Sequence, residues 1–389
     1  MQLKLSRTAL VLPILIMAIL PLIASWFAYP QTHLPPGFAV FPPLFVENPP
    51  GFNLTIFVLL ALVEIASIIF LIFPQWFGFK QLNSQPEPPN QYAPLPIWFW
   101  LGLTVTVFFL WLMWTRETIF GNLVYYAFTP LWWGFIFTLD GVSYRLNNGY
   151  SLFAKRPKTL FISAIVSLFG WIFFEYFDYF ALGNWYYPNS NQIPTLNHTT
   201  VVALYLIAYT TVWPAIFEWY TIFNAFPKLV ARYAQGPKIS LPGKTILYAS
   251  FAMVFAVVFW PYPLFWVMWV GTMLGFAGLL ISLNIWTPFT ALEQGNWSPM
   301  LLIAISTIVN GYFWELWNYC SANPVNPITN PNYWKYDIPY VNVIHIFAEM
   351  PLLGYFGYLP FGVLAWVIWI WSGNVFGFST ALLEDSKGS

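Results

Sequence analysis

Charged residues are scarce in this chain of 389 residues: Asp, Glu, Lys and Arg make up 7% of it, with 14 basic residues balancing 14 acidic ones. An ordinary soluble domain carries about 25% charged residues. The composition therefore excludes a soluble globular enzyme, a nucleic-acid binder with a basic face and a disordered protein. It also excludes a disulfide scaffold, because the single cysteine, Cys320, has no partner within the chain.

Histidine is almost as rare, with three residues in the chain. His345 and Glu349 have a spacing typical of metal ligands, but a di-iron carboxylate bundle needs a Glu-x-x-His motif from each of two helices, and the sequence has none. Glycine-rich phosphate loops and nucleophile elbows are also missing. We therefore expect no metal, no cofactor and no nucleic-acid partner.

Apolar residues, in contrast, make up 59% of the chain. A membrane-spanning helix needs about 20 predominantly apolar residues, and ten such stretches predict an all-α, polytopic transmembrane helical bundle. The last stretch contains Pro351 and Pro360, which favours a half-helix followed by a full span. The ten stretches are Thr8–Tyr29, Leu54–Phe77, Pro96–Trp114, Leu123–Tyr144, Thr159–Leu182, Thr200–Phe223, Thr245–Trp260, Leu264–Trp286, Met300–Tyr319 and Val343–Trp371.

The basic residues predict the orientation of these spans. With both termini in the cytoplasm, only Arg116 and Lys335 of the 14 Lys and Arg residues lie outside, which is a strong positive-inside bias. We expect an integral protein of a bacterial inner (cytoplasmic) membrane. Two proline-rich loops, Pro30–Asn53 outside and Ser84–Pro96 inside, are expected to be stiff spacers or docking strips.

An internal repeat is the most informative feature. Both copies contain an aromatic-Glu-x-aromatic-(Asp/Asn)-Tyr string, a loop with Trp-x-Tyr, an Ile-Pro-x-x-Asn motif and a Tyr-x4-Pro motif, always in this order. The first copy has Phe174-Glu175-Tyr176-Phe177-Asp178-Tyr179, Trp185, Ile193 and Tyr209, and the second has Trp314-Glu315-Leu316-Trp317-Asn318-Tyr319, Trp334, Ile338 and Tyr355.

Each copy is predicted to span three helices, and one further span separates them. Both copies then enter the membrane in the same direction, which makes them parallel repeats with a functional site expected between them. The predicted organisation is an N-terminal three-span region with proline-rich loops (1–120), repeat A (121–224), a basic cytoplasmic loop with a linker span (225–261), repeat B (262–372) and a cytoplasmic tail (373–389).

Acidic residues inside spans are costly and indicate function. The chain has seven inside or at the ends of spans: Glu64, Asp140, Glu175, Asp178, Glu218, Glu315 and Glu349. A spacing of three residues places Glu175 with Asp178, and Glu315 with Asn318, on one helix face. Interhelical hydrogen bonding that only fixes packing is the competing interpretation.

These residues define a candidate site at the outer leaflet. Glu175, Asp178 and Glu315 are its hypothetical catalytic groups, and His345 and Glu349 are expected to share a helix face beside them. Aromatic residues make up 22% of the chain, and they either serve as packing and interfacial anchors or line a cavity for a long apolar ligand. The predicted ligand-binding residues are Trp171, Trp185, Trp314, Trp317, Asn318, Trp334, His345 and Glu349.

The tandem three-helix units, the aromatic-acidic string and the Trp-x-Tyr loop resemble the membrane-integral lycopene cyclase domains. The stretch Asp178–Tyr187 is similar to that family's Trp-Asp…Trp-x-(Tyr/Phe) region, although Phe177 replaces the Trp and the second copy has Asn318 in place of Asp. The resemblance implies acid-initiated chemistry on a carotenoid-like polyene, in which Glu175 or Glu315 donates the proton and aromatic faces stabilise the carbocation.

The leading hypothesis is a membrane protein whose halves enclose a carboxyl–aromatic site that binds, or also acts on, an apolar lipid or isoprenoid. A non-enzymatic subunit of a larger membrane assembly is the first alternative, with the proline-rich loops docking partner membrane subunits. A transporter is the second alternative, which parallel repeats permit. In each case membrane lipids surround the protein.

Overall fold

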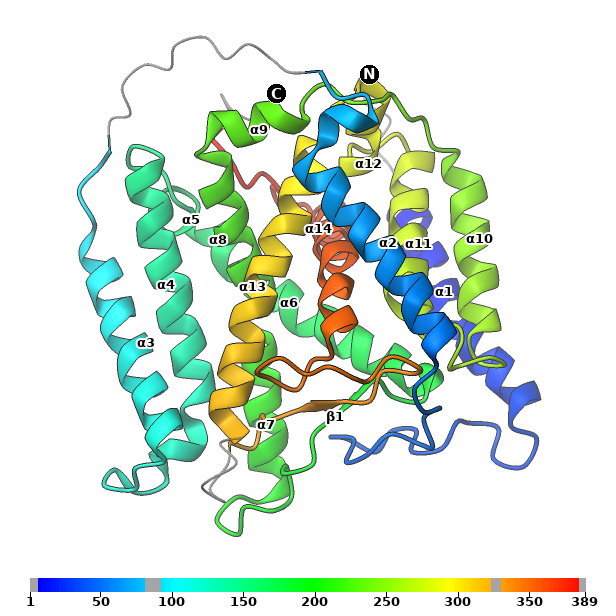
Figure 1. Cartoon of the computed structure of the whole chain (residues 1–389), viewed down its shortest axis with the longest axis horizontal. Helices are drawn as coiled ribbons and strands as arrows, with labels where there is room; N and C mark the ends of the chain where they lie inside the picture. Colours follow the sequence, from blue (N-terminus) through cyan, green and yellow to red (C-terminus); the bar gives the residue numbers. More distant parts are fainter. Residues whose placement is uncertain (1–5, 81–91, 323–329, 385–389) are drawn as a thin grey trace.

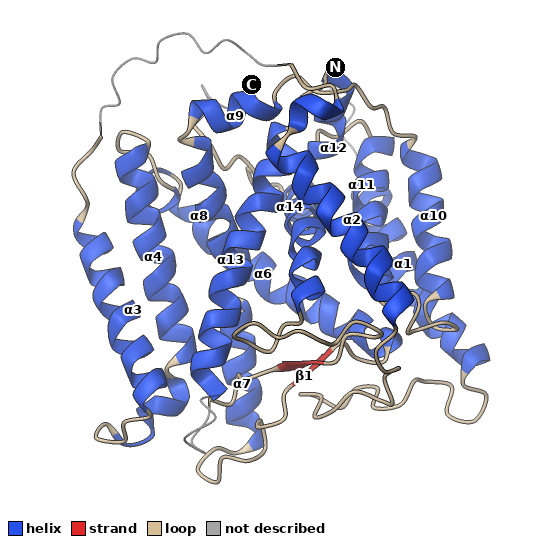
Figure 2. Ribbon diagram, viewed as in Figure 1, coloured by secondary structure: helices blue, strands red, loops and turns tan. Residues whose placement is uncertain are grey.

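The computed structural model describes residues 6–80, 92–322 and 330–384 of the chain, and its regular structure is almost entirely helical (Figure 1, Figure 2). The longer helices are α1 (Arg7–Ala28), α2 (Leu54–Ile72), α3 (Ile97–Thr115), α4 (Phe128–Leu146), α6 (Pro157–Asp178), α7 (His198–Tyr209), α8 (Val212–Asn224), α10 (Gly243–Ala256), α11 (Val267–Ser282), α13 (Ser298–Ala322) and α14 (Tyr358–Phe376). The shorter elements are α5 (Leu152–Lys155), α9 (Pro227–Tyr233), α12 (Pro288–Ala291), the 3-10 helices η1 (Pro74–Phe77), η2 (Gly121–Tyr126), η3 (Tyr179–Ala181), η4 (Leu292–Gln294) and η5 (Leu352–Gly357), and the strands β1 (Trp185–Tyr186) and β2 (Lys335–Tyr336).

Seven helical segments of the described chain are long and apolar enough to cross a membrane. Two more, α10 and α11, are apolar but have only 14 and 16 residues. The predicted all-α class is confirmed, and the chain is an integral membrane protein. The seven segments are Arg7–Ala28, Leu54–Ile72, Ile97–Thr115, Pro157–Ala181, His198–Asn224, Ser298–Ala322 and Leu352–Phe376.

The centre of the bundle is formed by helices of both predicted repeats. Helix α8 packs against α4, α6 and α13, and α14 packs against α11 and α13. Large aromatic side chains fill the space between them, among them the fully buried Trp132, Trp213 and Trp369. Both chain ends lie at one end of the bundle, and the short strands lie at the opposite end (Figure 1).

Two peripheral helix pairs pack very closely because glycines face one another. A Cβ atom at Gly134 of α4 would come within 2.8 Å of the Thr106 backbone nitrogen on α3. Between α10 and α11, a Cβ atom at Gly278 would come within 2.6 Å of the Leu247 backbone nitrogen. Small residues at such contacts let helix backbones approach in a membrane, where dispersion forces hold helices together.

Strands β1 and β2 join the two predicted repeats directly (Figure 2). They pair antiparallel, with Trp185 opposite Tyr336 and Tyr186 opposite Lys335. Each strand follows the helix that carries one of the repeated glutamates, α6 for β1 and α13 for β2. The pairing therefore brings together two loops that are about 150 residues apart in the sequence.

The predicted run Thr200–Phe223 is divided into two helices, with a break at Thr210 and Thr211. Pro214 cannot donate a backbone hydrogen bond at the start of α8. The first backbone nitrogens of α8 have no acceptor within the helix. The Ser167 hydroxyl of α6 accepts hydrogen bonds from two of them, those of Val212 and Trp213, each at 3.1 Å. A side chain of the neighbouring helix α6 thus provides the hydrogen-bond acceptor that these backbone nitrogens lack at the break.

The prediction of a helical segment over Val343–Trp371 was wrong for its first nine residues. Residues 343–351 form no helix, and helical structure begins at Leu352, directly after Pro351. His345 and Glu349 therefore do not share a helix face. His345 is exposed and forms an isolated antiparallel bridge with Pro351.

Parts of two other predicted segments cannot be described. Residues 84–91 of the proline-rich segment Ser84–Pro96 lie outside the described residues, and so do residues 385–389 of the predicted tail. The other proline-rich loop, Pro30–Asn53, lies at the strand end of the bundle and contacts it, since the Tyr187 nitrogen donates to the Pro43 carbonyl at 2.7 Å.

We expect Gly134→Ala to destabilise the protein by about 1–3 kcal/mol, the usual cost of overpacking a well-packed interface. The added methyl group must push α3 away from α4. The measurement is denaturant unfolding in detergent micelles, with Gly51→Ala as the control because a Cβ atom at Gly51 meets nothing within 4 Å. Equal stability of the two variants would contradict the close packing of α3 and α4.

Candidate functional site

Glu175 is buried near the end of α6, where four neutral donors converge on its Oε1 atom. The indole nitrogens of Trp171 and Trp185 donate at 3.1 Å each. The hydroxyls of Tyr187 and Tyr209 donate at 2.7 and 2.9 Å. Because an indole nitrogen can only donate, this oxygen must act as an acceptor.

Glu315 occupies the corresponding place on α13 and is fully buried. Its Oε1 atom accepts hydrogen bonds from the hydroxyls of Tyr336 at 2.8 Å and Tyr358 at 2.7 Å. Its Oε2 atom is buried without a hydrogen-bond partner among the described residues. The Met350 backbone contributes a further hydrogen bond to this carboxyl, and Glu315 thus has two side-chain donors where Glu175 has four.

The two clusters have the same layout. In each, one tyrosine comes from the Trp-x-Tyr loop, Tyr187 or Tyr336, and the other from the next long helix, Tyr209 or Tyr358. The Tyr-x4-Pro motif pointed to Tyr355 in the second copy, but Tyr358, one helical turn further on, makes the hydrogen bond to Glu315.

Asp178 and Asn318 hold the strands in place. The Oδ1 atom of Asp178 accepts from the backbone and side-chain nitrogens of Asn184, at 3.0 and 2.9 Å. Asn318 makes two hydrogen bonds to the backbone of Trp334, at 2.8 and 3.0 Å. Both side chains are therefore occupied by the loop that carries the Trp-x-Tyr motif, which supports a structural role for them.

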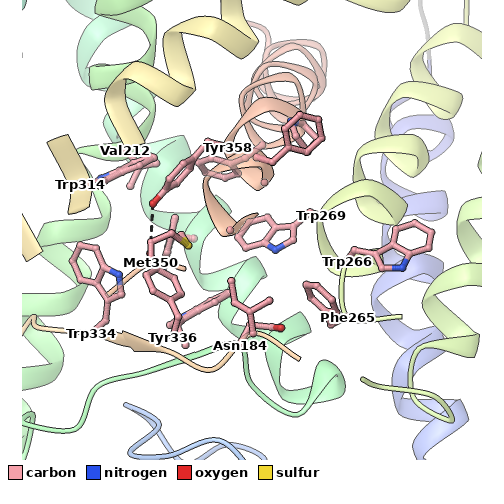
Figure 3. Close-up of a pocket in the computed structure, with 18 of the residues that line it drawn as sticks. Asn184, Val212, Phe265, Trp266, Trp269, Trp314, Trp334, Tyr336, Met350 and Tyr358 are labelled. Atoms are coloured by element: carbon pink, nitrogen blue, oxygen red, sulfur yellow. Dashed lines mark hydrogen bonds between the residues drawn. The ribbon is translucent and has the colours of Figure 1, made fainter. Parts of the chain in front are cut away.

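A cavity of about 490 Å³ lies between the two carboxyl clusters (Figure 3). Tyr187, Tyr209, Tyr336 and Tyr358 are all part of its wall. The carboxyls of Glu175 and Glu315 are not, so the tyrosines stand between them and the cavity. Further wall residues are mostly aromatic or aliphatic, among them Trp171, Trp185, Trp269, Trp314, Trp334 and Phe361.

Figure 3 shows wall residues from both predicted repeats: Asn184 and Val212 come from repeat A, and the other labelled residues come from repeat B. Trp314, Trp334 and Tyr358 lie on one side, and Phe265 and Trp266 on the opposite side, with Trp269 between them. The side chain of Phe361 makes ring contacts with both Trp269 and Trp314, at 5.3 and 5.9 Å between centroids. The wall of the cavity is thus mostly aromatic, and its polar side chains include the tyrosines together with Glu64, Asn184, Thr211 and Asn332.

The remaining predicted residues are placed apart from the cavity wall. Trp317 is buried at the α4 side of α13, in ring contact with Trp132 and Phe135. His345 is exposed at the surface. Glu349 accepts a hydrogen bond from the Tyr333 hydroxyl; burial, and then this carboxyl, raise the pKa of Tyr333, which keeps its hydroxyl a donor.

A second pair of buried carboxyls, Asp140 on α4 and Glu218 on α8, lies outside this site. Asp140 accepts from the Trp98 indole at 2.9 Å, from the Ser151 hydroxyl at 2.8 Å and from the Phe153 backbone nitrogen at 2.7 Å. It also shares a hydrogen bond with Glu218. These hydrogen bonds tie α4 to α3, to α8 and to the start of α5, as polar side chains that only fix helix packing would do.

Metal binding finds no support in the part of the chain that the structure describes, where no three His, Cys, Asp or Glu side chains gather into a ligand set. Comparisons with models of protein families, with curated proteins and with solved structures gave no match.

The hydrogen bonds to the two carboxyls predict unequal costs for removing them. Replacing Glu175 by Leu removes the acceptor of four side-chain donors, and replacing Glu315 by Leu removes the acceptor of two; each donor that finds no other partner costs about 1–3 kcal/mol. We expect Glu175→Leu to be the more destabilising change in denaturant unfolding. Equal losses, or a larger loss for Glu315→Leu, would contradict the hydrogen-bond pattern.

Proposed function

We propose that the protein binds an apolar lipid or isoprenoid in the cavity between the Glu175 and Glu315 clusters. The observation that carries this proposal is the cavity itself, an aromatic box of about 490 Å³ in the interior of a membrane protein. Ligand pockets are typically about 300–1,000 Å³, mostly apolar, with a few well-placed polar groups. Here those polar groups include four tyrosine hydroxyls, each hydrogen-bonded to a buried carboxyl.

We also propose that this site arose by duplication, with ten membrane-associated helices and both termini in the cytoplasm of a bacterial cell. The strand register supports it, because Tyr186 and Lys335 occupy the same position in the two Trp-x-Tyr motifs and lie opposite each other. Pairing of equivalent residues in antiparallel strands is what a two-fold axis along the membrane normal would produce.

The duplicated unit in this proposal has four helices rather than three. Helix α10, expected to be only a linker, packs against α11 through Gly243 and Gly278, as α3 packs against α4 through Gly102 and Gly134. Glycines of α4 and α11 recur at the same spacing of seven residues, at Gly134 and Gly141 and at Gly271 and Gly278. Four helices per unit again give parallel copies.

The resemblance to the lycopene cyclases leads us to propose acid-initiated chemistry on a carbon–carbon double bond. The π electrons of the ligand take a proton from the Glu315 cluster through a tyrosine hydroxyl, and a new C–H bond forms. The resulting carbocation is stabilised by aromatic faces. Attack by a neighbouring double bond closes a ring, and a carbon next to the cation loses a proton to the Glu175 cluster.

The two carboxyls suit these opposite tasks. Glu175 has four side-chain donors on one oxygen, against two for Glu315, and donors favour the charged form of a carboxyl, so of the two groups Glu175 is the better proton acceptor. Glu315 has only two side-chain donors, so its charged form receives less support and the group is better suited to act as the acid. One proton enters the ligand and one leaves it, so the product is an isomer and no oxidant or reductant is consumed.

Filling the cavity tests ligand binding. Gly357 lies in the wall, has helical backbone angles, and a Cβ atom there meets nothing within 4 Å. We expect Gly357→Leu to fold but to lose most of the lipid that copurifies with the wild type, measured by mass spectrometry of solvent extracts. Gly51→Leu is the matched control, because Gly51 also has free space and lies outside the wall.

Identical extracts from wild type and Gly357→Leu would contradict a ligand in this cavity. Stable partner subunits in the purified sample, with no bound lipid, would favour the structural role instead.

Acid chemistry is tested separately with Glu315→Gln. Loss of a general acid reduces rates by about 10²–10⁴-fold, so we expect cells supplied with an acyclic polyene to stop accumulating its cyclised isomer. Glu349→Gln is the matched control, since Glu349 lies in a loop outside the cavity wall. An unchanged ratio of cyclic to acyclic product in a folded Glu315→Gln variant would rule out the acid role.

A further inference from the structure

Helix α2 crosses the mouth of the cavity. Leu60, Val63 and Glu64 of α2 belong to the cavity wall, yet Leu60 and Val63 are 37% and 54% exposed. Trp266, on the other side of the mouth, lines the cavity and is 40% exposed. Residues that line a cavity and also reach the surface mark its opening, so the cavity opens sideways, toward the lipid.

The two ends of α2 are tied to the bundle, whereas its middle is loosely packed. The Asn53 backbone nitrogen donates to the Tyr340 carbonyl at 3.0 Å, and the Tyr233 hydroxyl donates to the Leu71 carbonyl at 2.8 Å. Between these ties, no residue of α2 is buried, and its main contact within the bundle is η5, itself part of the cavity wall.

Glu64 is a half-buried carboxyl in this opening. It is the eleventh of the 19 residues of α2, so at 1.5 Å per residue it lies about 15 Å from the first residue of the helix. A membrane has a hydrocarbon core of about 30 Å, which places Glu64 near its middle. Within the described residues, no side chain forms a hydrogen bond or ion pair with this carboxyl.

We infer that the ligand of this cavity is an isoprenoid or lipid chain with a neutral hydroxyl group, which enters past α2 and is bound by Glu64. The inference rests on the proposed function and specifies its ligand class. A cationic or phosphate-bearing end would have to be brought to the middle of the membrane at a high cost. A hydroxyl both donates and accepts, so it can pair with a carboxyl in either protonation state.

The test compares two probes that differ in one group: farnesol, an isoprenoid alcohol, and farnesene, the matching hydrocarbon. Bound probe is counted by native mass spectrometry of the full-length protein released from detergent micelles. We expect the wild type to retain farnesol about fivefold better than farnesene, the ratio that one hydrogen bond typically provides.

Three variants assign this preference to Glu64. Glu64→Leu is expected to bind both probes equally, while its unchanged farnesene binding shows that it is folded. Glu64→Gln keeps a hydrogen-bonding group and is expected to keep the preference. Ser67→Ala, the control, removes a hydroxyl that donates to the Val63 carbonyl within the same helix, and it is expected to leave binding unchanged.

The outcomes separate the two proposals. If the wild type binds both probes equally and Glu64→Leu changes nothing, the role of Glu64 is overturned while the apolar cavity remains a binding site. If the wild type binds neither probe, and Gly357→Leu is indistinguishable from it, isoprenoid binding itself is overturned.

Discussion

The burial of two carboxyl groups, Glu175 and Glu315, is the constraint on which the strand end of this molecule depends. A carboxyl removed from water must be hydrogen-bonded, or its burial costs several kcal/mol. Among the described residues, no basic side chain donates to either group; the side-chain donors are Trp and Tyr hydrogens. In each cluster, one tyrosine donor comes from the Trp-x-Tyr loop and the other from a helix. The Trp and Tyr residues that donate to the two carboxyls also form part of the wall of the cavity.

Asp178 and Asn318 extend this arrangement to the backbone. Each lies one helical turn after its glutamate and binds the loop that returns with a tyrosine. The loops then meet as β1 and β2, so the hydrogen bonds of one cluster position the other. A change in either carboxyl is therefore expected to affect both halves of the cavity.

Composition and local pattern were sufficient for the class of protein and for the key carboxyls. Hydropathy and helical spacing depend on neighbouring residues, and these correctly indicated an all-α membrane protein with Glu175 and Glu315 on long helices. Hydropathy and helical spacing were insufficient to predict the conformation of residues 343–351. The apolar run after Val343 has no helix before Leu352, because Pro351 and a bridge to His345 hold it in another conformation.

What the sequence by itself determined is the membrane setting, since so few charges cannot cover a soluble surface, and the two aromatic-Glu strings. Only the tertiary structure decided which tyrosines reach each carboxyl, with Tyr358 rather than Tyr355 beside Glu315. It also placed the tyrosines, not the carboxyls, in the cavity wall, and brought Glu64 of the distant α2 to its opening. These contacts join helices that are up to about a hundred residues or more apart in the sequence. The pattern of neighbouring residues carries no information about which of these helices pack together.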